Sequence, residues 1–62
     1  MSGFEHLTEA KLRRLIAELQ YRLDANDPDR EDFRRFGERW CVRYREDIRI
    51  YKGEVTRRGF AV

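Results

Sequence analysis

Residues 29–52 read DREDFRRFGERWCVRYREDIRIYK, and this stretch decides the fold. Its aromatic residues recur at steps of three, four, four and seven, the spacing of one face of an α-helix. They are Phe33, Phe36, Trp40, Tyr44 and Tyr51. Arginines fill most of the remaining circumference. The stretch therefore predicts one long helix over 29–52, with an apolar face to bury and a charged face to present.

A second amphipathic helix is predicted upstream, over residues 8–24. Thr8 is a suitable N-cap, and Leu7 and Leu12 hold the two positions of a hydrophobic staple. The apolar positions of this helix repeat at helical spacing and are Leu12, Leu15, Ile16, Leu19 and Leu23. Between the two helices, residues 25–28 (ANDP) favour a turn. We expect residues 1–7 to form an arm and residues 53–62 to form a tail.

The two segments predict one all-α domain over 1–62, an antiparallel helical hairpin, because a short connection makes helices neighbours. A chain of 62 residues is marginal when it folds alone. A single Cys41 and a single His6 exclude an internal disulfide and a Cys/His zinc site, which leaves self-association as the way to add stability.

We therefore expect a homodimer, in which two hairpins form a four-helix bundle. The second helix is longer than the first, so its far end has nothing in the first helix to cover it. The expected core and dimer residues are Leu12, Leu15, Leu19, Leu23, Phe33, Phe36, Trp40, Tyr44, Ile48 and Tyr51.

Two features leave alternatives open. Asp47 falls inside the apolar arc, so either it pairs with Arg43 one turn back or the helix ends near it. Residues 48–56 (IRIYKGEVT) also fit a small β-hairpin, although Gly53 suits the end of a helix. Gly37, on the core arc, indicates that another helix or ring approaches closely.

Charge is dense but nearly balanced, with 14 basic and 12 acidic residues. Most bases are arginine, which suits bidentate contacts and stacking on aromatic rings. Carboxylates stand one turn away from many of them, in pairs such as Glu31–Arg35, Arg34–Glu38 and Arg43–Asp47. A dedicated duplex-DNA binder would carry a larger basic excess, so the balance favours ion pairs over phosphate contacts.

Several arginines have poorer partners in the sequence, and we expect these to make external contacts. Val42 and Ile50 lie outside the core arc among such arginines, a combination typical of protein-binding surfaces. The candidate partner-binding residues are Arg39, Val42, Arg45, Ile50, Arg57, Arg58, Arg13 and Arg14.

The residues for catalysis are missing. The one Ser, one Cys and one His do not form a nucleophile–base set on so short a chain, and the four glycines are too scattered for a phosphate loop. We therefore expect no enzyme activity, no cofactor and no metal. The sequence also lacks a leader-like start and an apolar run long enough for a membrane span, so we expect a cytoplasmic protein.

The outline resembles the Rop family of plasmid RNA-binding proteins in its length, its two helices, its tight turn and the LDAN motif at 23–26. This resemblance implies a dimeric hairpin but carries no site, because the first helix offers different residues from the family's recognition set. They are Lys11, Arg14, Glu18, Tyr21 and Arg22. The size and the RRG-containing tail are also similar to small phage and mobile-element proteins.

The leading hypothesis is a protein–protein interaction module, a phage or mobile-element regulator or inhibitor that binds a host protein through an arginine-rich helix face. The alternative is a dimeric regulator that binds RNA or DNA. A phage structural joining protein is a third possibility, supported by class-level analogy alone.

Overall fold

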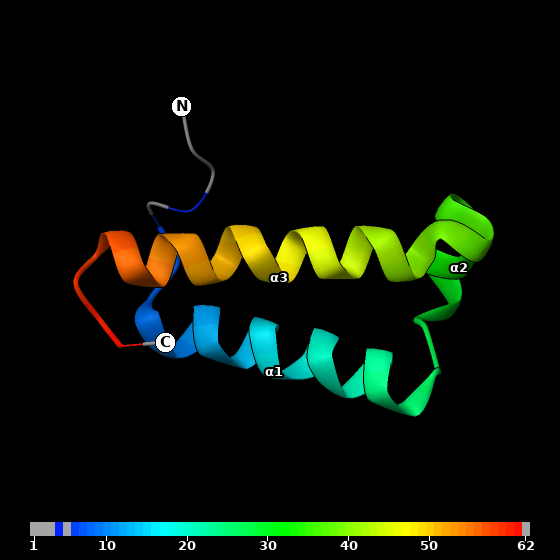
Figure 1. The fold of residues 1–62 in the computed structure, drawn as a ribbon, viewed down its shortest axis with the longest axis horizontal. Helices are drawn as coiled ribbons and strands as arrows, with labels where there is room; N and C mark the ends of the chain where they lie inside the picture. Colours follow the sequence, from blue (N-terminus) through cyan, green and yellow to red (C-terminus); the bar gives the residue numbers. More distant parts are fainter. Residues whose placement is uncertain (1–3, 5, 62) are drawn as a thin grey trace.

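The computed structural model describes residue 4 and residues 6–61. Over this part the chain is helical and forms no strand, with α1 (Glu9–Ala25), α2 (Arg30–Phe36), a 3-10 turn η1 (Gly37–Arg39) and α3 (Trp40–Arg57). Helices α1 and α3 pack side by side in opposite directions, and α2 closes one end (Figure 1). The predicted all-α hairpin is confirmed at this level.

Helix α1 is built as its sequence predicts. The Thr8 side chain accepts a hydrogen bond from the Lys11 amide at 3.1 Å, which satisfies one of the free N–H groups of the first turn. At the other end Asn26 adopts a left-handed conformation with φ 53°. The Asn26 and Asp27 amides then donate back to the Leu23 and Arg22 carbonyls, which stops the helix before the turn.

The prediction of one unbroken helix over 29–52 is wrong, because the chain breaks at Gly37. Gly37 has φ 61° and ψ −141°, a conformation that is essentially restricted to glycine. The predicted close approach at Gly37 is also wrong, since a Cβ built there would meet nothing within 4 Å. Gly37 is therefore required by the backbone, and it separates α2, which Asp29 caps, from α3.

Helix α3 runs five residues beyond its predicted end, and residues 48–56 are helix rather than hairpin. Gly53 costs a helix interior about 1 kcal/mol relative to alanine. Burial of Val55, which is 1% exposed, favours the longer helix in spite of this cost. The stop comes at Gly59 (φ 89°), where the Gly59 and Phe60 amides donate to the Thr56 and Val55 carbonyls.

The core lies between α1 and α3. Its buried apolar residues are Leu12, Trp40, Tyr44, Ile48 and Val55. Leu15, Leu19, Leu23, Phe36 and Tyr51, all predicted as core, are half-buried at its edges. Phe33 is a correction: its side chain is 48% exposed, because the break at Gly37 takes α2 out of helical phase with α3.

Tyr44 connects α3 to the start of α2. Its ring packs edge-on against Trp40 with centroids 5.4 Å apart. Its hydroxyl donates to Asp32 Oδ2 at 2.5 Å and accepts from the Asp29 amide at 3.2 Å. Burial raises the pKa of Tyr44, and the bond to Asp32 acts in the same direction. This link fixes the short α2 to the hairpin.

A second link, which we call the terminal clasp, joins the two ends of the chain. It consists of Glu54, Arg58 and the backbone carbonyls of Phe4 and Leu7. The Arg58 guanidinium donates to both carbonyls, at 2.6 and 2.5 Å, and to Glu54 at 2.8 Å. The Phe4 ring meets Tyr51 edge-on at 5.5 Å, so the arm covers part of the C-terminal half of α3.

The chain forms a single layer of helices. Its extents along the three principal axes are 34 × 25 × 15 Å. Within the described residues, no helix combines the length and the apolar character that crossing a membrane requires.

Candidate functional site

The candidate site is the side of α3 that points away from α1. We define this outer face by Arg39, which precedes the helix, and by Val42, Arg45, Glu46, Arg49 and Ile50 on it. Trp40, Tyr44 and Ile48 point inward, so residues two positions along from each of them point outward. Val42 is 54% exposed and Ile50 42% exposed, which confirms this placement.

The arginines of the outer face have no partner within the described part of the chain. Arg39, Arg45 and Arg49 form no hydrogen bond or ion pair there, although Glu46 lies among them. The break at Gly37 removes the helical spacing that Arg34 would need to meet Glu38. Free guanidinium groups on a rigid helix can form bidentate bonds with carboxylates or phosphates.

Two shallow hollows flank Glu46 on this face. The first has a volume of ≈ 360 Å³ and is lined by Arg35, Phe36, Arg39, Val42, Arg43 and Glu46. The second has a volume of ≈ 340 Å³ and is lined by Arg45, Glu46, Arg49 and Ile50. Each hollow combines an apolar side chain with arginines, and Glu46 belongs to both.

Arg43 separates the first hollow from a groove on the neighbouring side. Its guanidinium lies 5.6 Å from the centre of the Phe36 ring, and that of Arg35 lies 6.0 Å from the same centre. Arg43 also pairs with Asp47 at 3.3 Å, which confirms the first of the two alternatives for Asp47. Burial nevertheless raises the pKa of Asp47.

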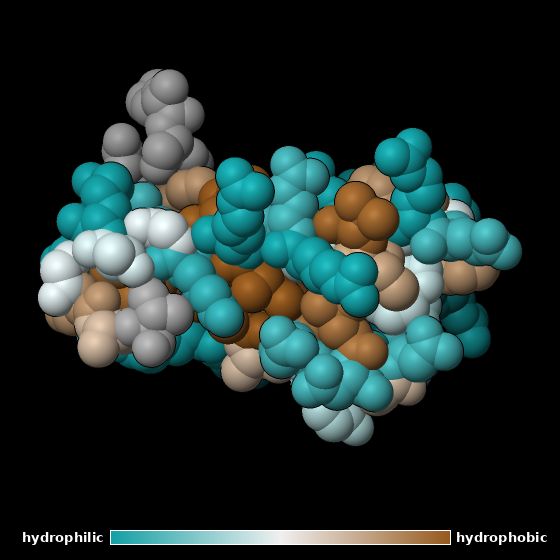
Figure 2. All heavy atoms as spheres, in the orientation of Figure 1, coloured by the Kyte–Doolittle hydropathy of each residue, from teal (hydrophilic) through white to brown (hydrophobic). Residues whose placement is uncertain are grey.

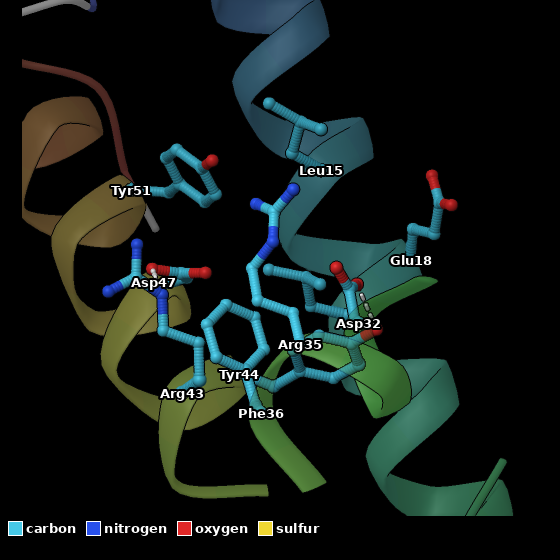
Figure 3. A pocket seen from close by; sticks show the side chains of 10 residues that line it. Leu15, Glu18, Asp32, Arg35, Phe36, Arg43, Tyr44, Asp47 and Tyr51 are labelled. Carbon is cyan, nitrogen blue, oxygen red and sulfur yellow. Dashed lines mark hydrogen bonds and ion pairs between the residues drawn. The ribbon is translucent and has the colours of Figure 1, made fainter. Parts of the chain in front are cut away.

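This groove face lies between α1, α2 and α3 and holds ≈ 270 Å³ (Figure 3). Its apolar lining includes the half-buried Leu15, Leu19, Phe36 and Tyr51. Figure 3 shows the Arg35 side chain extending across it toward Leu15. Apolar surface is also visible along the middle of the face shown in Figure 2, between rows of hydrophilic side chains.

Three of the candidate partner-binding arginines have partners inside the chain. Arg13 pairs with Glu9 at 2.7 Å and donates to the Ala61 carbonyl. Arg57 and Arg58 both bind Glu54, at 2.6 and 2.8 Å. The expectation that these arginines have poor partners within the chain is therefore wrong, and for Arg57 and Arg58 the i, i+3 and i, i+4 spacing to Glu54 was the overlooked signal. Arg14 is exposed on α1, apart from the outer face of α3.

Glu46 and Arg49 were not among the predicted site residues. Their signal was present in the sequence, because positions 42, 46, 49 and 50 stand at i, i+4, i+7 and i+8 and so share one helix face. Cys41 is half-buried next to this face. Among the described residues, the acidic, Cys and His side chains nowhere gather in the groups of three that would hold a metal ion.

Comparisons of the chain with protein-family models, with curated proteins and with solved structures give no match. We therefore infer the function from the geometry of the chain itself.

Proposed function

We propose that this chain is a small, non-enzymatic interaction module that binds a partner protein through the outer face of α3. One observation carries the proposal: Arg39, Arg45 and Arg49 have no partner within the described part of the chain and surround the exposed Val42 and Ile50. Arginines beside an apolar patch are enriched in protein interfaces. The small size fits a regulator or inhibitor of the kind that phages and mobile elements encode. The proposed partner is a host protein.

The proposal includes self-association into a four-helix bundle through the groove face. The accessible surface is 4978 Å² for 7.6 kDa, about 700 Å² more than a compact monomer of this mass exposes. A standard interface buries about 800 Å² per partner. The radius of gyration, 12.2 Å, also exceeds the roughly 10.6 Å of a compact chain of this length.

The two surfaces serve different purposes in this scheme. A second copy seated on the groove face covers Leu15, Leu19, Phe36 and Tyr51 and adds the second helix layer that most domains have. The outer face of α3 then remains free for the partner protein. Light scattering tests the dimer: we expect twice the mass of the chain, and a cooperatively folded monomer would contradict it.

Affinity capture from the native host, with protein identification, tests the function. The wild-type chain is compared with the double variant Arg39→Glu/Arg45→Glu and with Arg30→Glu, a matched charge reversal on α2 outside both hollows. We expect a partner that the wild type and Arg30→Glu retain and the double variant loses. A partner retained equally by all three would overturn the outer-face proposal.

The same free arginines support nucleic-acid binding as the second candidate. Against it, Glu46 lies among them, and Arg13 and Arg58, which would add phosphate contacts, are engaged within the chain. A binder that makes several phosphate contacts loses orders of magnitude in affinity between low and moderate salt. Absence of binding to mixed RNA and DNA at about 50 mM salt would end this alternative.

A further inference from the structure

We propose that the outer face of α3 recognises an acidic amphipathic helix, which inserts one apolar side chain into each of the two hollows. The inference rests on the proposed function and specifies its partner. It follows from the spacing of the hollows, from the charge around them and from the lack of a free backbone edge on α3.

The spacing of Val42, which lines the first hollow, and Ile50, which lines the second, fits two successive contacts of a helix. Val42 and Ile50 are eight residues apart on α3, a rise of about 12 Å. A partner helix that runs alongside α3 presents residues seven or eight positions apart at about 10.5 to 12 Å on one face. Two such residues therefore reach the two hollows together.

An extended peptide fits this surface less well. Recognition by strand addition requires a backbone edge with free N–H and C=O groups. Residues 42–50 lie inside α3, where the backbone groups bond to one another along the helix. Only side chains remain to make contacts on this face, and an amphipathic helix supplies a matching row of side chains.

The charge of the outer face selects an acidic partner. Arg39, Arg45 and Arg49 are unpaired within the described chain, and Glu46 is the single carboxylate of the face. Carboxylates on the partner helix, next to its two apolar residues, would meet these guanidinium groups in bidentate pairs. Glu46, between the hollows, disfavours an acidic residue midway between the two apolar contacts and so sets the register.

Three capped, alanine-based helical peptides test the inference. The first carries two Leu residues seven positions apart on one face, with Glu residues beside them. The second has the same composition with the two Leu residues on opposite faces. The third has Lys in place of Glu. Their affinities are measured by fluorescence anisotropy at about 50 mM salt, and backbone amide shifts of the labelled protein locate the contact.

We expect the first peptide to bind at least tenfold more tightly than the other two and to shift the amides of residues 39–50. Val42→Ser and Arg45→Glu should each weaken it tenfold or more, whereas Arg30→Glu should leave it unchanged. Equal binding of the three peptides, no binding of the first, or shifts confined to α1 would overturn the inference. Tighter binding of a single-stranded oligonucleotide than of the first peptide would overturn it as well.

Failure here is distinguishable from failure of the proposed function. If a captured partner is lost by Arg39→Glu/Arg45→Glu but the acidic helix does not bind, the outer face is a protein-binding surface for another type of segment. If capture does not depend on the outer face at all, the proposed function itself fails.

Discussion

The inner and outer faces of α3 satisfy their polar groups in opposite ways. On the inner side, the Tyr44 hydroxyl both donates and accepts a hydrogen bond, and no buried polar side-chain atom of the described residues lacks a partner. On the outer side, Arg39, Arg45 and Arg49 have none within the described chain. One face of α3 thus belongs to a core whose polar groups are hydrogen-bonded. The other face presents arginines without partners in the described chain, next to exposed apolar residues.

This difference shows which face is explained by the needs of folding. Unsatisfied polar groups are costly when buried but nearly free in water, so the outer arginines contribute little to the fold. The fold accounts for the inner face, and the proposed partner would account for the outer one. Substitutions on the two faces should therefore affect different properties.

The largest effect is expected at the centre of the inner face. Trp40 is 5% exposed, and Trp40→Ala should cost about 3–5 kcal/mol, enough to unfold so small a domain. Val42→Ala, two residues away on the outer face, should change stability by less than about 0.5 kcal/mol. Thermal and urea denaturation followed by circular dichroism measures both, and similar losses for the two variants would contradict the division of α3.

The terminal clasp should give the next largest effect. Hydrogen bonds from Arg57 and from the clasp residue Arg58 hold the pKa of Glu54 down, from 4.5 to about 2. A lowered folded-state pKa means that the stabilisation is present above pH 4.5 and is lost as the pH falls from there toward 2. Arg58→Gln should lower the melting temperature at neutral pH, since it also releases the Phe4 and Leu7 carbonyls.

Arg57→Gln is the matched control for the clasp. It shares Glu54, but its side chain is 65% exposed, whereas that of Arg58 is 20% exposed. The control should shift the melting temperature less than Arg58→Gln does.

Asp47 acts against the effect of Glu54 on acidification, because its raised pKa means that protonation stabilises the folded form. Glu54→Gln removes the carboxylate with the lowered pKa, so its stability should no longer fall as the pH falls from 4.5 toward 2. A pH dependence of stability equal to that of the wild type would count against the clasp.

Alanine substitutions at two glycines should have smaller effects on stability, with opposite signs. Gly37→Ala should destabilise by about 1–3 kcal/mol, because the φ of 61° is strained for any residue with a Cβ. Gly53→Ala should stabilise by about 0.5–1 kcal/mol, since Gly53 lies inside α3 with open space around its Cα. Equilibrium unfolding measures both, and a stabilising Gly37→Ala would contradict the break between α2 and α3.

The smallest effect on stability is expected on the outer face. Arg45→Ala should change the free energy of unfolding by no more than about 0.5 kcal/mol, because among the described residues the side chain has no partner to lose. Urea denaturation monitored by Trp40 fluorescence is a sensitive check. A loss of more than about 1 kcal/mol would show that Arg45 supports the fold.

The sequence predicted the hairpin because both amphipathic repeats are long and regular. It did not predict the break, since Gly37 inside an arc of aromatics is compatible with a continuous helix until its φ is known. The end of α3 was placed too early because the burial of Val55, which depends on tertiary packing, offsets the local preference of Gly53.

The candidate site was predicted in part. Arg39, Val42, Arg45 and Ile50 follow from the helical repeat alone and lie together on the outer face. For Arg58 the i, i+4 spacing to Glu54 was overlooked, and its two other partners, the Phe4 and Leu7 carbonyls, are about fifty residues away in the chain. Contacts between the ends of a chain leave no periodic signal.

The double variant Arg39→Glu/Arg45→Glu tests the division of α3 most directly when stability and binding are measured on the same sample. We expect an unfolding midpoint within experimental error of the wild type and a loss of at least tenfold in affinity for the captured partner protein. Unchanged affinity, or a variant that no longer folds, would contradict it.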